Sequence, residues 1–283
     1  MAMWFWIVSL LLTTIAILGN ALVIYLIITR RRLRTKTNWF IFSLAVADII
    51  LVAVFIPPHF GCQIAGCSHS MVILHLVSYF GEVSATNIMA FTVDRYCAIV
   101  LALKYTHLIT TKTITLLLMS AWFAPLILDV IPTLVLSNEL QYIAQLTSMV
   151  IFQIAPCIFL AIAMIKIIKI ANSHSRRTSV LSKQLRFNHP RQRVQGKSDV
   201  TSSRLIIFMV GIFLACYICQ SLSSLCACFP SCIELQPKEV VEYTLSFLLL
   251  VNSGANPFVY ALFKRDIKKE FSRMFLCKRR TER

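Results

Sequence analysis

The sequence predicts an all-α membrane protein, a bundle of seven transmembrane helices followed by a short amphipathic helix on the cytoplasmic side. Of its 283 residues, 58% are hydrophobic and 14% are charged, and the mean hydropathy is +0.74, whereas soluble domains carry about 25% charged residues. Apolar stretches of about 20 residues, the length that crosses a bilayer, recur along the chain. The basic residues cluster between alternate stretches.

Seven stretches qualify as spans, and the connections between them are short with one exception. The first stretch lacks a basic leading region and an A-x-A-like cleavage site, so we expect an uncleaved span rather than a signal peptide. Residues 137–145 are expected to be barely a turn. Residues 171–200 are polar and basic and are expected to form a long cytoplasmic loop, and residues 264–283 an amphipathic helix and tail. The expected spans are 4–29, 38–60, 70–99, 113–136, 146–170, 203–227 and 240–263.

The distribution of Lys and Arg predicts the orientation of these spans. There are 28 Lys and Arg against 12 Asp and Glu, and every basic residue except Lys238 lies on one side of the membrane. Basic residues concentrate on the cytoplasmic side. We therefore expect a multi-pass plasma-membrane protein with its N-terminus outside and its C-terminus inside. Because the charge is interleaved with spans rather than gathered on a soluble face, nucleic acid is not an expected partner.

Polar and special residues stand at particular places in these spans. An adjacent Asp94-Arg95-Tyr96 ends span three. The motifs, in chain order, are Gly19-Asn20, LAVAD (44–48), VDRYCAIV (93–100), Trp122, Pro156, NSGANPFVY (252–260) and FKRDIKKEF (263–271). In this order and on these sides, they resemble the motifs of rhodopsin-like (class A) G-protein-coupled receptors, and the resemblance covers all seven spans.

The resemblance implies a receptor, not an enzyme, that binds an extracellular ligand within the bundle and makes a heterotrimeric G protein release GDP. It implies that Arg95 pairs with Asp94 and, at rest, reaches Asp199 at the start of span six. The G protein would then insert a helix into an opened cytoplasmic cleft, with Leu103 as its apolar anchor. A bland reading of Arg95 as an interfacial, snorkelling side chain stays open. The implied coupling residues are Asp94, Arg95, Tyr96, Leu103, Asp199, Asn256, Pro257 and Tyr260.

Asp48 needs partners, because a carboxylate inside a bilayer is costly. The resemblance makes it the centre of a polar cluster that holds a sodium ion as an allosteric modulator, the only cofactor implied. Hydroxyl, amide and carboxylate oxygens suit such a hard cation. The alternative is a neutral, hydrogen-bonded structural aspartate. The implied cluster contains Asn20, Asp48, Ser84, Asn252 and Ser253.

Prolines inside spans predict places where helices bend. Pro257 removes one backbone hydrogen bond and kinks span seven, which lets the half that carries Tyr260 occupy two positions. Pro156 loosens span five in the same way, and by the resemblance Phe213 packs near it. Tyr217 stands where the family has a tryptophan and Cys219 where it has a proline, so the transmission through span six departs from the family's pattern.

The ligand pocket also departs from familiar branches. Val77 stands where amine receptors carry an aspartate. Two other carboxyls, Glu82 and Asp129, lie on spans that neighbour each other in this family. They form either a protonated structural pair or a partner for a cationic group on a ligand.

The cysteines predict no usual outer disulfide, since 137–145 has none and Ser70 occupies the expected position in span three. Some branches, among them melanocortin and lysophospholipid receptors, also lack that bond. In an oxidising outer compartment, a local pair joining Cys232 to Cys226 or Cys228 is expected.

Cys277, among basic residues after the amphipathic helix, is a palmitoylation candidate, and that helix is expected to contact the bilayer.

Two other classes of function remain open at this stage. A small ion-coupled or proton-coupled transporter would explain the buried carboxyls of Asp48, Glu82 and Asp129. A non-signalling partner of another receptor would explain the altered span six. Neither explains why Asp94-Arg95-Tyr96 and NPFVY both lie at cytoplasmic ends of spans.

Overall fold

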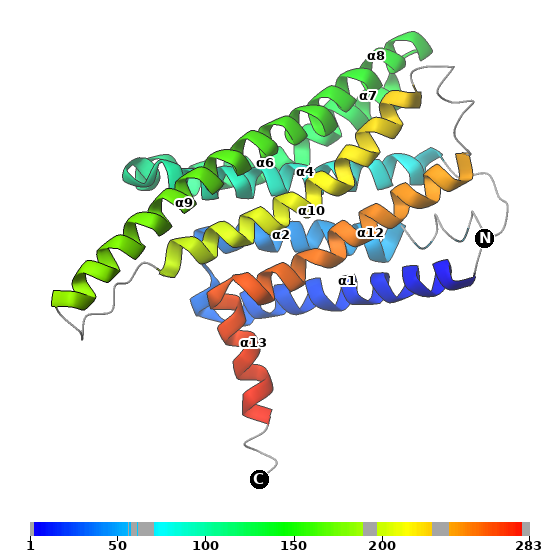
Figure 1. Cartoon of the computed structure of the whole chain (residues 1–283). Coiled ribbons are helices and arrows are strands. Elements are labelled where there is room, and N and C mark those ends of the chain that lie inside the picture. The colour runs from blue at the N-terminus through cyan, green and yellow to red at the C-terminus, as the bar shows by residue number, and fades with distance from the viewer. Residues whose placement is uncertain are drawn as a thin grey trace.

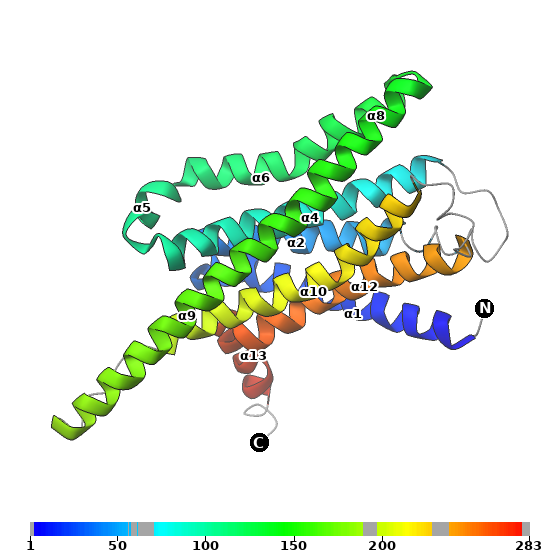
Figure 2. The same cartoon turned by 45° about the horizontal axis from the view of Figure 1, so that its top comes forward.

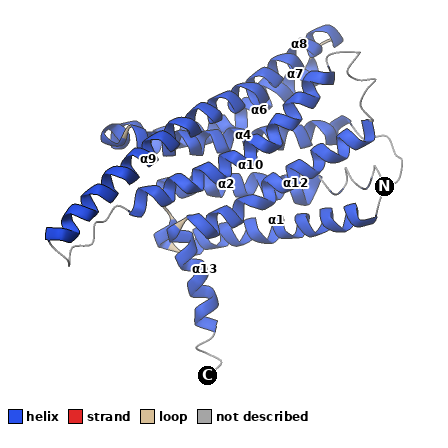
Figure 3. Cartoon of the chain, in the orientation of Figure 1, coloured by secondary structure: helices blue, strands red, loops and turns tan. Residues whose placement is uncertain are grey.

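Helices account for nearly all of the residues that the structure describes. The computed structural model describes residues 3–55, 57, 61, 71–188, 197–227 and 238–278. Within that part of the chain there are helices and no strands (Figure 3). The longest helices are α1 (Met3–Thr29), α2 (Lys36–Ile50), α4 (Met71–Val100), α6 (Thr111–Pro125), α9 (Ala155–Asn188), α10 (Lys197–Ala227) and α12 (Lys238–Phe263). The shorter α-helices are α5 (Tyr105–Leu108), α7 (Ile131–Val135), α8 (Asn138–Ser148) and α13 (Arg265–Lys278).

The helices form one bundle with α4 at its centre. Neighbouring pairs are α1 with α2 and α12, α10 with α9 and α12, and α4 with α2, α6, α9 and α10; Figures 1 and 2 show the arrangement from two sides. Among the described residues, six helices are long and apolar enough to cross a membrane, or up to seven when His75–Val100 is taken with the bent Ala102–Leu108. The predicted all-α bundle is confirmed.

The core is apolar, and so is much of the surface. Large buried side chains such as Phe40, Phe91 and Phe213 interlock in the middle of the bundle. Leu10, Leu116 and Leu262 are at least 60% exposed on the outside of their helices. In a soluble protein such exposure would be unfavourable, but lipid tails are as apolar as leucine. The bundle therefore has the surface of a protein that lies in a bilayer.

A glycine lets α1 and α12 approach closely. A Cβ atom placed on Gly19 would lie 2.8 Å from both Cβ and Cγ of Pro257, well inside van der Waals contact. Gly19 is therefore needed where the proline of the NPxxY-like motif packs, and α1 contacts α12 closely at Pro257.

Three segments widen into π-helical turns: Leu51–Phe55 (η2), Leu126–Val130 (η4) and Met149–Ile154 (η5). Such turns insert an extra residue and occur often at functional sites, because they re-aim side chains. The turn η4 follows Pro125, which lacks the N–H that a regular helix needs, and it carries Asp129.

Two connections differ from the expectation. Helix α8 begins at Asn138, so residues 138–145 of the expected turn are helical, and the bend between α7 and α8 is confined to Leu136 and Ser137. Helix α9 continues to Asn188, so most of the expected loop 171–200 is helical. Residues 171–188 contain no Gly or Pro, and their Arg, Lys, Gln and Leu residues favour helix; polarity alone does not end a helix.

The amphipathic helix α13 follows α12 at a steep angle (Figure 1). It is held by a buried Ile267, by a hydrogen bond from Asn38 Nδ2 to Asp266 Oδ2 at 3.1 Å, and by an ion pair between Arg30 and Glu270 at 3.7 Å. We call the end of the bundle that carries Arg95 and α13 the inner end, and the opposite end the outer end.

Candidate functional site

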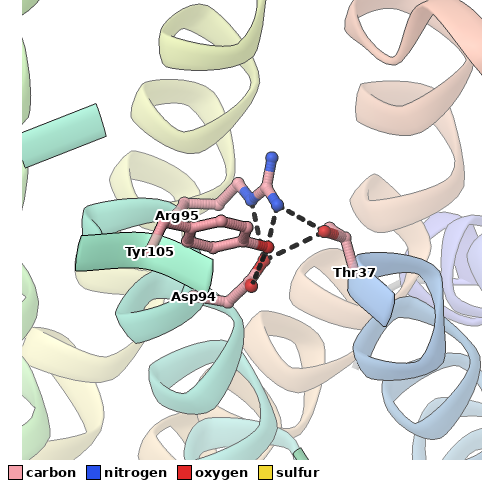
Figure 4. Close-up of polar contacts among 4 residues, drawn as sticks. All are labelled: Thr37, Asp94, Arg95 and Tyr105. Atoms are coloured by element: carbon pink, nitrogen blue, oxygen red, sulfur yellow. Dashed lines mark hydrogen bonds and ion pairs between the residues drawn. The ribbon is translucent and has the colours of Figure 1, made fainter. Parts of the chain in front are cut away.

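A polar network surrounds Arg95 at the inner end (Figure 4). Asp94 is fully buried, and the Arg95 side chain is 18% exposed. The guanidinium donates from Nε and Nη2 to the same carboxylate oxygen, Asp94 Oδ2, at 2.9 and 2.6 Å. Arginine keeps its charge at any physiological pH and needs a partner when it is partly buried. The adjacent carboxylate supplies that partner.

Two side chains from other helices complete this network. Thr37 of α2 accepts a hydrogen bond from Arg95 Nη2 and donates to Asp94 Oδ2 at 3.1 Å. Tyr105 of α5 donates to Asp94 Oδ1 at 2.9 Å. The network therefore joins three helices, as Figure 4 shows. Neither residue belongs to a short motif, and the sequence analysis missed both.

The surface around this network combines an aromatic and an apolar residue. Lys166 of α9 lies over the Tyr96 ring, with its Nζ 5.9 Å from the ring centroid, within reach of a cation–π interaction. Leu103, in the turn after α4, is 97% exposed. A single fully exposed leucine beside a charged network is available to a partner protein.

Lys264 stands at the junction of α12 and α13, just beyond the membrane-spanning segment. Its side chain is partly buried. Desolvation by burial lowers the pKa of Lys264 from 10.5 to about 8, the nearby Asp266 offsets part of this, and the positive charge of Arg95 adds to it. The inner network thus contains a second cation that burial has made a weaker base.

A second cluster surrounds Asp48, which is fully buried. Its Oδ1 accepts hydrogen bonds from Ser84 Oγ at 3.1 Å and Ser253 Oγ at 2.9 Å, and its Oδ2 accepts one from Asn256 Nδ2 at 2.8 Å. Helices α2, α4 and α12 meet there. Each carboxylate oxygen has a donor, so the buried charge is well solvated by the protein.

The membership of this cluster differs from the expected one. Asn256, assigned to the coupling group, binds Asp48 directly. Asn20 is next to it but donates to the backbone oxygens of Ala16 and Ser253, and its own Oδ1 is buried without a partner. Asn252 is buried, and no hydrogen bond joins it to Asp48 among the described residues. The helical period decides this, because Ser253 and Asn256 are three residues apart and face the same way.

The middle of the bundle carries an aromatic pair on α10. Phe213 and Tyr217 stack with ring centroids 4.0 Å apart, and both are buried, as is Pro156 on α9. The Tyr217 hydroxyl donates to the backbone oxygen of Gly81 on α4 at 2.5 Å. This hydrogen bond joins α10 to α4. A tryptophan, the family's usual residue here, has no hydroxyl and cannot make it.

Toward the outer end, the three residues predicted for the ligand pocket differ in character. Glu82 and Asp129 are each 6% exposed, and their carboxylates are close enough to interact electrostatically. Val77 is half-buried against a small apolar cluster that includes Phe80 and Trp122. Trp122 itself donates to Ser43 Oγ at 2.9 Å, which ties α6 to α2.

Several predicted residues cannot be placed as side chains. The backbone of Asp199 lies in α10 and that of Cys277 in α13, but both side chains, and the whole of Cys228 and Cys232, lie outside the described residues. Cys226 is disulfide-bonded. Its partner is none of the described free cysteines, Cys97, Cys157, Cys216 and Cys219.

The chain is similar in sequence to known membrane receptors over most of its length. The family described as "7 transmembrane receptor (rhodopsin family)" matches residues 19–260. An octopamine receptor beta-2R of Chilo suppressalis is 28% identical, covering 95% of this chain and 79% of the relative. The octopamine receptor beta-2R of Drosophila melanogaster is 27% identical, but the chain spans only 60% of its length.

Relatives with other names are similar at nearly the same level. An adenosine receptor A2b of Bos taurus is 24% identical over 95% of this chain and 90% of its own. A melanocortin receptor 5 of Rattus norvegicus is 25% identical over 95% of this chain and 83% of its own. The family match covers most of the chain, the relatives named here are receptors rather than enzymes, and the apolar helices are those of a multi-pass membrane protein. The chain belongs to the rhodopsin family of seven-transmembrane, G-protein-coupled receptors.

Proposed function

We propose that this receptor binds an extracellular ligand between its helices and, in response, promotes GDP release from a heterotrimeric G protein at the inner end. The observation that carries the proposal is the network around Arg95. A permanently charged, largely buried guanidinium is held by the carboxylate of Asp94 and the hydroxyl of Thr37, and a hydroxyl from a third helix, that of Tyr105, donates to the same carboxylate. Such a group is poised to change partners when one of those helices moves.

The output step follows from this arrangement. At rest, Arg95 is bound to Asp94, and we assign Asp199 on α10 as its further resting partner. When the inner end of α10 tilts outward, Arg95 loses that partner and a cleft opens beside it. The C-terminal helix of a Gα subunit then enters the cleft, and Leu103, which is fully exposed, packs against the same subunit.

A sodium ion is proposed as a modulator of the resting state. The fit of the residues supports it: Asp48, Ser84 and Ser253 converge through oxygen atoms, and the buried Asn20 Oδ1 is an acceptor with no donor. Hard cations take such oxygen ligands. The ion would supply a positive charge that balances Asp48, and the same residues hold α2, α4 and α12 together.

The orientation of the protein is part of the proposal. We place the N-terminus outside and the tail in the cytoplasm of the plasma membrane, because basic residues gather at the inner end. The relatives are named for octopamine, adenosine and melanocortin. Those names point to different molecules, so they do not choose a ligand for this chain.

A transporter is the second candidate, favoured by three buried carboxyls in the spans, Asp48, Glu82 and Asp129. Ion or proton flux through liposomes that contain the purified protein distinguishes the two functions. A receptor gives no flux, whereas a transporter gives flux that stops when Asp48 is replaced.

The receptor proposal is tested by GDP release. Purified protein in nanodiscs is mixed with a panel of heterotrimeric G proteins, and nucleotide exchange is measured for wild type, Arg95→Ala and the control Lys104→Ala, which removes an exposed cation nearby. We expect basal exchange with at least one G protein, lost in Arg95→Ala and kept in Lys104→Ala. Equal exchange in all three proteins, or exchange with none of the panel, contradicts the proposal.

A further inference from the structure

The outer half of the bundle holds acceptor groups that lack donors. Glu82 is more than nine-tenths buried, yet its Oε2 has no hydrogen-bond partner. Asp129 is equally buried as a residue, at 6% exposed. Gln153 adds a third acceptor, since its Oε1 is buried and unpartnered. Buried oxygens of this kind are rare, because each one costs free energy unless a donor meets it.

These groups lie on elements that pack against one helix. Glu82 is on α4, about 20 Å along the helix from Arg95. Asp129 is on the π-helical turn η4 and Gln153 on the π-helical turn η5, and both turns contact α4. The carboxylates of Glu82 and Asp129 interact with each other. The turn η4 therefore brings a second acid to the region of α4 that carries Glu82, and Gln153 lies on a second irregular turn that contacts the same helix.

The chemistry of this region selects its ligand. Two carboxylates and an amide oxygen accept hydrogen bonds, and two of these oxygens, Glu82 Oε2 and Gln153 Oε1, are buried with no hydrogen-bond partner. An ammonium offers three N–H donors and a guanidinium five, with a positive charge and no acceptor. Such a group satisfies several buried oxygens at once and balances their charge, which a neutral hydroxyl cannot do.

We propose that Glu82 and Asp129 together anchor the ammonium or guanidinium group of a small organic cation, with Gln153 as an additional acceptor. This deepens the receptor function proposed above and rests on it for the consequence of binding. The anchor does not include Val77, whose apolar side chain has neither a charge nor an acceptor for a cation.

The anchor is joined directly to the hydrogen bond between α10 and α4. Gly81, the residue before Glu82, accepts the hydrogen bond from the Tyr217 hydroxyl, and Tyr217 stacks on Phe213. One turn further along α4, Thr86 Oγ1 donates to the backbone oxygens of Glu82 and Ala121. A cation bound to Glu82 therefore acts on the neighbouring peptide group, whose oxygen accepts the Tyr217 hydrogen bond. Because Tyr217 is on α10, the effect reaches that helix.

The test measures binding, independently of any G protein. Unfolding temperature of the full chain in nanodiscs is titrated with tyramine, with agmatine, and with tyrosol, in which a hydroxyl replaces the ammonium of tyramine. We expect at least one cation to raise the unfolding temperature in a saturable way, and tyrosol to have no effect. Glu82→Gln and Asp129→Asn should raise the half-saturating concentration at least about 30-fold, since each leaves a buried cation with one partner fewer.

Controls separate the anchor from a general loss of a buried carboxylate. Glu270→Gln removes a carboxyl that is 7% exposed but lies on α13, and it should leave the titration unchanged. Glu82→Asp, which keeps the charge, should retain most of the binding. This variant is used in the titration if either neutral variant does not fold. The proposal is overturned if neither cation stabilises wild type, if tyrosol acts as tyramine does, or if the neutral variants bind as wild type. Saturable binding without GDP release would refute the receptor function and leave the anchor standing.

Discussion

Asp94 and Arg95 show how a single pair of side chains acquires a role from its surroundings. A charged pair at the end of a span would be ordinary if it faced water. Here the carboxylate is fully buried, and Thr37 and Tyr105 bind it from two other helices. The pair therefore senses the relative positions of α2, α4 and α5, which is what a switch at the inner end requires.

Lys264 should make stability depend on pH. Its pKa falls from 10.5 to about 8 because of burial, so between these two values the unfolded chain binds more protons than the folded one. Stability must then rise with pH across this range, since the cost of the buried charge disappears as the proton leaves. We expect the unfolding temperature of wild type to rise relative to Lys264→Met between pH 7 and about 9.5.

The exposed neighbour Lys268 supplies the control for this measurement. The difference between wild type and Lys268→Met should stay constant over the same pH range. A constant difference for Lys264→Met as well would show that Lys264 keeps an ordinary environment in the folded protein.

Asp48 should make stability depend on the identity of the cation in the buffer. At equal ionic strength, sodium should raise the unfolding temperature of wild type above its value in potassium or choline, because the oxygens around Asp48 suit a small hard ion. Asp48→Asn should remove the difference, and Ser84→Ala should reduce it. A sodium effect that persists in Asp48→Asn would place the ion elsewhere.

At this scale the sequence predicted some contacts and missed others for identifiable reasons. Asp48 with Ser84 and Ser253 could be predicted because their residue types suit one another and the family resemblance groups them. Asn256 was assigned another role, although its spacing from Ser253 puts it on the same helix face. Thr37 and Tyr105 could not be predicted, because nothing local marks a residue whose partner is more than ten positions away.

Among the elements, the contact of α1 with α12 depends on the absence of a side chain. Gly19→Ala should destabilise the protein by about 1–3 kcal/mol, since the new Cβ would lie 2.8 Å from two atoms of Pro257. The measurement is the unfolding temperature in detergent. Gly211→Ala is the matched control, because a Cβ at Gly211 meets nothing within 4 Å and alanine favours helix.

The comparison of these two variants decides the point. If Gly19→Ala is as stable as Gly211→Ala, α1 and α12 do not pack as closely as described. Pro257 would then lack the close contact with α1 that we assign to it.

The sequence predicted a bundle of long apolar helices but not their irregularities. Hydropathy identifies a span because about 20 apolar residues have few other uses. It cannot show that α9 continues to Asn188, because a polar segment without Gly or Pro is free to extend a helix into water. It also cannot show a π-helical turn such as η4, where only Pro125 gives a local signal and packing against α4 sets the geometry.

In the whole molecule, the same helices connect the outer end of the bundle to the inner end. Toward the outer end lie Glu82, Asp129 and Gln153, the residues of the cation anchor that we propose. At the inner end, Asp94 and Thr37 hold Arg95, and Tyr105 binds Asp94. Tyr217 on α10 lies between them, bonded to the peptide beside Glu82. Because packed helices move as units between discrete arrangements, a displacement of a helix at the outer end also changes its position at the inner end.

The central claim is that a G protein docks at the inner end beside Arg95. Hydrogen exchange of the backbone amides in Ala102–Leu108, the exposed segment that carries Leu103, tests it most directly. The rates are measured for purified receptor alone and after each heterotrimeric G protein is added and its nucleotide removed. The account predicts slower exchange in this segment with at least one G protein, and no slowing when Leu103 is replaced by Asp. Exchange rates that stay unchanged with every G protein would contradict it.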